Sequence, residues 1–137
     1  MFHKLKESYK ADAMAACLTA MLGLIIITPI CGLLFQCQCD WPWLSFYSDC
    51  NYFHSEAIHK CPWCTSDIAG LGSIGMAFFL ALASLFFTRN RFAAKAIVVQ
   101  VTFGLTIFIL IAVLSGTLAA YSQHYPFGVG NFYTKRS

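Results

Sequence analysis

Three long apolar runs without charged side chains constrain this chain more than any other feature of its sequence. They span residues 13–35, 68–87 and 96–121, and none of them contains Asp, Glu, Lys, Arg or His. At a rise of ~1.5 Å per residue, about 20 helical residues cross the ~30 Å hydrocarbon core of a bilayer. With 58% hydrophobic and 11% charged residues, the chain is also too apolar for an ordinary soluble domain. The sequence therefore predicts an all-α membrane protein with three transmembrane helices.

The segments between these runs complete the predicted organisation. Residues 1–12 are basic, and they form either a short interfacial helix on the membrane surface or a solvated flank that sets the topology. Residues 36–67 form a Cys- and His-rich loop, residues 88–95 a short turn, and residues 122–137 an aromatic tail. The predicted order is thus segment, span, loop, span, turn, span and tail.

The distribution of lysine and arginine predicts which way the chain crosses the membrane. The loop at 36–67 has one basic residue, Lys60, whereas the two segments on the opposite side carry Lys4, Lys6, Lys10, Arg89, Arg91 and Lys95. Because short cytoplasmic segments carry an excess of Lys and Arg, residues 1–12 and 88–95 are predicted to be cytoplasmic. The Cys-rich loop and the tail are then extracytoplasmic, in an inner or plasma membrane.

Local patterns predict how the helices begin, bend and pack. Pro29 removes a backbone donor, which predicts a kink in the first span, and Asp67 with the Thr and Ser before it supplies N-cap chemistry for the second. Small residues recur at steps of three or four along the second span, at Ala69, Ser73, Ala77, Ala81 and Ser84. Since small faces let transmembrane helices approach closely, we expect this span to be the central helix and to contact other membrane subunits.

The composition argues against several classes of function. Pumps, ion channels and bis-histidine haem proteins usually need ionisable or histidine side chains within their spans, and the three spans have none. A net charge of +3 without a basic cluster argues against nucleic-acid binding. The predicted partners are the lipid bilayer and other membrane-protein subunits.

The chemistry of the chain is concentrated in the loop at 36–67, which contains five of the seven cysteines and two of the four histidines. Thiolate and imidazole side chains at C-x-C, H-x-C and C-x-x-C spacing suit a zinc or copper ion. The loop also has four acidic residues against one lysine, which favours a cation. The candidate metal ligands are Cys37, Cys39, Cys50, His54, His59, Cys61 and Cys64.

Two other interpretations use the same sulfurs. In an oxidising compartment, Cys61 and Cys64 could form a redox-active disulfide at a helix N-terminus. The four residues CPWC at 61–64 resemble one feature of the quinone-linked disulfide-generating membrane proteins, whose C-x-x-C opens a transmembrane helix; those proteins have four helices, whereas this chain offers three. Alternatively, purely structural disulfides staple the loop, with Cys31 as the sixth partner. Cys17 is read as a small apolar residue.

Aromatic residues interleave the candidate ligands. They are Trp41, Trp43, Phe46, Tyr47, Tyr52, Phe53 and Trp63. Such rings either anchor the loop in the interfacial region of the membrane or form a docking surface for a protein partner. The sequence favours a non-catalytic accessory subunit or assembly factor that holds zinc or copper beside a larger membrane complex. The alternatives are a membrane thiol–disulfide oxidoreductase, or a subunit whose loop is only stapled by disulfides.

The predicted orientation can be tested by chemical labelling in intact cells. A membrane-impermeant thiol reagent, applied after mild reduction or chelation, should modify cysteines of the loop, while a cysteine introduced between Arg89 and Lys95 should react only after lysis. Loop cysteines that react only after lysis would reverse the predicted orientation.

Overall fold

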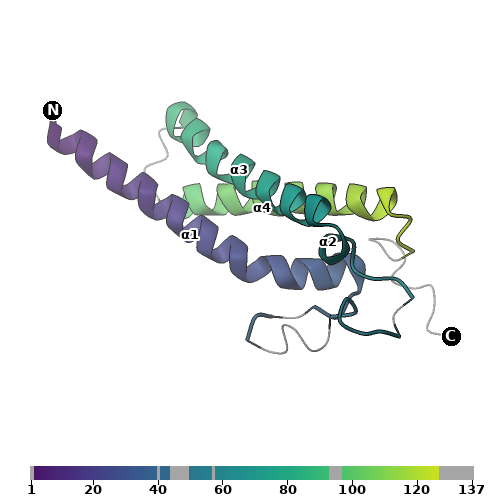
Figure 1. Cartoon of the computed structure of the whole chain (residues 1–137). Coiled ribbons are helices and arrows are strands. Elements are labelled where there is room, and N and C mark those ends of the chain that lie inside the picture. The colour runs from purple at the N-terminus through teal and green to yellow at the C-terminus, as the bar shows by residue number, and fades with distance from the viewer. Residues whose placement is uncertain (1, 40, 44–49, 57, 93–96, 127–137) are drawn as a thin grey trace.

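The computed structural model describes residues 2–39, 41–43, 50–56, 58–92 and 97–126. These residues form the helices α1 (Phe2–Phe35), α2 (Pro62–Thr65), α3 (Asp67–Phe92) and α4 (Ile97–Ser122), with no strand among them (Figure 1). Helices α1, α3 and α4 are long and apolar enough to cross a membrane, so the predicted all-α class with three spans is confirmed. Residues 93–95 of the predicted turn, residue 96 at the start of the predicted third span and residues 127–137 of the predicted tail lie outside the described residues.

Helix α1 is continuous from Phe2, so the basic segment at 1–12 leads into the first span without a break. Pro29 lies inside the helix and cannot donate to the carbonyl of Ile25, four residues earlier. The hydroxyl of Thr28 donates to that same carbonyl at 3.4 Å and partly replaces the missing bond. Figure 1 shows α1 curving along its length, as expected for a helix with an internal proline.

The start of α3 has the capping chemistry that the sequence predicted. Ser66 has an extended backbone between α2 and α3, and its Oγ accepts a hydrogen bond from the backbone N–H of Ala69 at 3.3 Å. This is the bond that an N-cap serine makes to the third helical residue. The C-x-x-C motif at 61–64 therefore belongs to a separate single turn, α2, and does not open the spanning helix α3.

Helix α4 is the central helix of the bundle, because it packs against both α1 and α3, which contact each other much less. The expectation that the second span would be central was therefore wrong. The buried face of α4 repeats every four residues and consists mainly of small side chains, at Gly104, Phe108, Ala112, Gly116 and Ala120. A β-carbon added at Gly104 would lie 3.0 Å from Thr19 of α1 and 3.1 Å from Leu85 of α3. Only a residue without a side chain allows both neighbours to approach so closely.

The predicted small face of α3 is part of the same interface. Ala77 and Ala81 are fully buried, and Ser73 is buried beside them. In contrast, the large apolar side chains of Leu71 and Phe79 on α3 are exposed. Small residues inside and large apolar residues outside are the arrangement expected for helices whose solvent is lipid.

Packing on this face should be sensitive to side-chain volume. We expect Ala77→Leu and Ala81→Leu to destabilise the helix bundle by about 1–3 kcal/mol, because each overfills a closed contact. Ile109→Leu, at an exposed position on α4, should have little effect. Thermal unfolding in detergent measures the difference, and equal stability of all three variants would show that the α3 face is not a packing surface.

Candidate metal centre

Six of the seven cysteines converge at one end of the bundle, where α1 ends and α2 begins. Cys31 lies on α1, four residues before its end, and the chain beyond α1 supplies Cys37, Cys39 and Cys50. The turn around α2 supplies Cys61 and Cys64. The seventh, Cys17, is exposed on α1 and lies apart from this group, which is referred to below as the thiol cluster.

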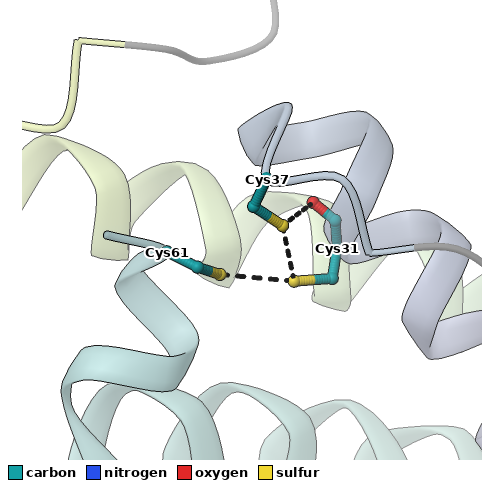
Figure 2. A group of neighbouring side chains, drawn as sticks. All are labelled: Cys31, Cys37 and Cys61. Atoms are coloured by element: carbon teal, nitrogen blue, oxygen red, sulfur yellow. Dashed lines mark hydrogen bonds between the residues drawn. The ribbon is translucent and has the colours of Figure 1, made fainter. Parts of the chain in front are cut away.

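Three sulfurs of the thiol cluster form a first triad (Figure 2). Cys31 Sγ lies 3.6 Å from Cys37 Sγ and 3.4 Å from Cys61 Sγ. The Cys37 thiol also donates to the carbonyl oxygen of Cys31 at 3.5 Å. All three residues are buried. Residues 30 positions apart in the chain are thus held within van der Waals distance through their sulfur atoms.

A second triad shares Cys37 with the first. Cys37 Sγ lies 3.3 Å from Cys39 Sγ, and Cys39 Sγ lies 3.1 Å from Cys50 Sγ. In each triad all the sulfurs lie within 4.8 Å of one another. The remaining thiol of the cluster, Cys64, lies outside both triads and lines one cavity with Cys31 of the first and Cys39 and Cys50 of the second. The six thiols therefore form one connected group.

The backbone after α1 folds back so that the C-x-C segment covers the end of the helix. Gln36 and Gln38 both have left-handed backbones, with φ of 51° and 62°. These two reversals bring the carbonyl of Cys39 onto Gly32, where any β-carbon would collide with that oxygen. Gly32 is therefore required for the return of the chain beside Cys31.

Asn51 joins the two halves of the thiol cluster. Its backbone N–H donates to the carbonyl of Cys37 at 2.9 Å, and its side-chain Oδ1 accepts from the backbone N–H of Cys61 at 3.0 Å. Its Nδ2 donates to the carbonyl of His59 and to the hydroxyl of Tyr125, each at 3.1 Å. Asn51 thus connects α2, through its side chain, to the C-x-C segment, through its backbone N–H.

Tyr125 closes the same end of the bundle from the segment after α4. Its hydroxyl donates to the carbonyl of Phe35, the last residue of α1, at 2.9 Å. Its ring meets that of Phe35 edge to face at 5.9 Å between centroids. Burial raises the pKa of Tyr125 to about 12, so the hydroxyl keeps its proton at neutral pH.

Trp63 of α2 packs into the bundle beneath the thiol cluster. Its ring lies edge to face with Phe35 at 5.1 Å, and a β-carbon added at Gly116 of α4 would lie 2.9 Å from it. The carbonyl of Trp63 contacts Gly70 of α3 so closely that a β-carbon there would collide with it. Among the described residues, the buried Trp63 Nε1 has no hydrogen-bond acceptor. Gly70 on α3 and Gly116 on α4 therefore leave the space in which α2 packs.

The electrostatics of the thiol cluster favour thiolate at some sulfurs and thiol at others. Hydrogen bonds from Cys31, with those from Cys39 and Cys61, lower the pKa of both Cys37 and Cys64. Burial raises the pKa of Cys50. A thiolate is the form that binds metal ions, and a bound cation would stabilise the negative charge that burial otherwise disfavours.

The sulfur separations are compatible with a shared metal ion. They exceed the ~2.05 Å bond of a disulfide, and all seven cysteines are free thiols. In each triad the sulfurs lie within 4.8 Å of one another, near enough to bind one ion with Zn–S bonds of ~2.3 Å. No family model, curated protein or solved structure matches this chain. The chemistry of the site is that of its own residues: two groups of three thiols, made up of five cysteines, that could hold a soft metal ion.

The structure brings together the five cysteines that the sequence nominated, but it does not bring the two histidines to them. His54 and His59 are both exposed, and neither belongs to the groups of residues that could share an ion. The ring of His59 instead lies against Tyr125 at 6.4 Å. The role of the histidines as ligands thus stays a prediction.

Cys31 was not among the predicted metal ligands, because it lies within an uncharged span and was considered only as a disulfide partner. In the structure it is central to the first triad. The sequence feature that could have indicated this role is the position of Cys31 one residue before Gly32, near the end of the helix. A cysteine followed by the smallest residue at a helix end leaves room for a returning chain.

A cavity of about 330 Å³ opens beside the thiol cluster. Four of its lining residues are cysteines of the cluster, and Tyr52 and Phe53 form part of its apolar wall. Cys39 and Cys64, which are only half-buried, line it. The cavity gives a small ion or a thiol reagent a route to the sulfurs.

The contacts of Tyr125 predict how tightly this end of the bundle is closed. Tyr125→Phe removes the bonds to Phe35 and Asn51, and each such bond contributes roughly 0.5–1.5 kcal/mol. We expect thiol reagents to modify the cluster roughly tenfold faster in this variant. Because the pKa of Tyr125 is raised, its contribution to stability is fully present below pH 10 and is lost as the pH rises through about 12.

The matched control is Tyr121→Phe, since Tyr121 is exposed on the last turns of α4. Its modification rate should equal that of the unmodified protein. Equal rates in both variants would contradict a closing role for the Tyr125 hydroxyl.

Proposed function

We propose that this chain is a small membrane-embedded accessory subunit or assembly factor that holds a thiophilic metal, zinc or copper, beside a larger membrane complex. The observation that carries the proposal is the thiol cluster itself. Six thiols from four separate parts of the chain meet at one end of the bundle, and the sulfurs of five of them lie 3.1–3.6 Å from a neighbouring sulfur. Soft sulfur ligands of this kind select zinc or copper(I) over calcium or magnesium.

The burial of the sulfurs supports a bound metal. Cys37 and Cys61 are fully buried, and Cys31 and Cys50 nearly so. A structural zinc or copper site is typically closed in this way, because the protein supplies all the ligands and excludes water. The energy of metal binding would then contribute directly to the folding of the loop, which has little apolar core of its own.

The accessory role is supported by the exposed surfaces around the thiol cluster. Trp41 and Trp43 stack at 5.1 Å, and Trp43 is 66% exposed. Phe53 is also exposed on the described part of the loop. Exposed aromatic area of this kind suits a partner protein at the membrane surface.

Contact with another subunit through α3 is a further part of the proposal. The small face of α3 is already used inside the bundle, but Gly72 and Gly75 are exposed and have open space around them. A neighbouring transmembrane helix could approach α3 closely along these glycines. We further propose that the thiol cluster faces the extracytoplasmic side, as the distribution of basic residues indicates.

A thiol–disulfide oxidoreductase based on Cys61 and Cys64 is the competing function. Its attacking thiol would need to be reachable by a substrate. Cys61 is fully buried and Cys64 only half-buried, so Cys64 would have to be the attacking residue. The metal and redox functions differ in their response to chelators and reductants.

The test is the metal content of the protein purified without chelators, measured by elemental analysis together with a free-thiol count. We expect stoichiometric zinc or copper, and a measurable loss of metal in Cys61→Ser. Cys17→Ser is the matched control and should keep its metal, because that thiol lies outside the cluster. His59→Ala should also keep it; a loss would make the imidazole a ligand.

The same preparations distinguish the redox function. A chelator should expose the thiol cluster to modifying reagents, whereas a reductant should not. Protein without stoichiometric metal, with a reductant-sensitive bond between Cys61 and Cys64, would overturn the proposal in favour of the oxidoreductase.

A further inference from the structure

The thiol cluster has more sulfurs than one metal ion can use. A structural zinc ion takes four ligands, and the two triads together with Cys64 bring six thiols to this end of the bundle. The sulfurs also do not collect around a single centre. They divide into two triads, Cys31–Cys37–Cys61 and Cys37–Cys39–Cys50, which share the fully buried Cys37.

Cys64 completes this division. It belongs to neither triad, and it lines the same cavity as Cys31 of the first triad and Cys39 and Cys50 of the second. If Cys37 and Cys64 are both shared, each side of the cluster has four sulfurs. Six thiols then supply two tetrahedral sites, with two of the thiols acting as bridges.

The charge of the cluster favours two divalent ions. Six thiolates carry a charge of minus six, which two divalent ions reduce to minus two and two monovalent ions only to minus four. Lys60, the basic residue of the described loop, is exposed over the ring of Tyr52 at 5.7 Å. Because most of these sulfurs are buried, the smaller residual charge has the lower desolvation cost.

We propose that the thiol cluster is a binuclear centre for two divalent ions of the zinc class, bridged by the sulfurs of Cys37 and Cys64. This inference rests on the proposed function and specifies its site. Binding would exchange thiol protons for metal and needs no oxidant or reductant. Cys31 and Cys61 would complete the first site, and Cys39 and Cys50 the second.

The experiment is a zinc titration of the full-length chain in detergent under reducing, anaerobic conditions, followed by removal of loose metal and elemental analysis. We expect two zinc ions per chain. Cys50→Ser changes only the second site and Cys61→Ser only the first, so each should keep about one ion. Cys37→Ser, which alters both sites, should lose more metal than either, and Cys17→Ser should keep two.

A second measurement keeps the test valid if a variant fails to fold. Cadmium-113 NMR of the unmodified chain loaded with cadmium should give two resonances from sulfur-only sites. A single resonance at one ion per chain would overturn the binuclear centre.

The outcomes separate this inference from the proposed function. One zinc ion per chain, lost entirely in both Cys50→Ser and Cys61→Ser, would overturn the binuclear centre and leave a metal-holding subunit. No bound zinc or copper, with cysteines recovered as disulfides, would overturn both.

Discussion

The structure depends on the close approach of helices at Gly116 on α4. Leu34 and Phe35 at the end of α1 and Trp63 of α2 all meet this one glycine, with Leu34 at 3.0 Å from the position of an added β-carbon. Helices in lipid gain little from burying apolar surface against each other, so they need such small residues to make dense contacts. The site at the end of the bundle can form only because α1, α2 and α4 meet there.

That contact explains how a short loop holds six thiols together. The loop has few apolar contacts of its own, but its two ends are attached to rigid helices. Cys31 lies near the end of α1 and the C-x-C segment follows it. Cys61 and Cys64 are held by α2, which packs in the space that Gly70 and Gly116 leave. Asn51 and Tyr125 then connect the two ends through hydrogen bonds. A metal ion would be held by parts of the chain that the membrane bundle has already positioned.

The fold was largely predictable from the sequence, because hydrocarbon thickness fixes the length of a spanning helix. The small face of α3 and the Ser66 cap were also readable, since both depend on local spacing. The central place of α4 was not predicted. The few polar residues of α4 do not gather on one side of the helix, so its sequence does not single out the face that carries Gly104, Ala112 and Gly116.

The candidate site was only partly predictable, for two physical reasons. Ligand spacing nominated the five loop cysteines as candidate ligands. Cys31 was not nominated, because it lies at the end of a span and every residue of a span was taken as part of an apolar helix. Spacing also nominated His54 and His59. Both are exposed in the folded chain, and their role as ligands stays a prediction. Whether a polar residue points into a site is decided by the turns at Gln36 and Gln38 and by α2, and these depend on tertiary contacts.

The central claim is that the metal is held by thiolates alone. X-ray absorption spectroscopy at the metal edge of the purified, metal-loaded protein tests it most directly. The account predicts a first coordination shell of sulfur only, at ~2.3 Å if the metal is zinc. A shell that contains nitrogen or oxygen ligands in place of sulfur would contradict it.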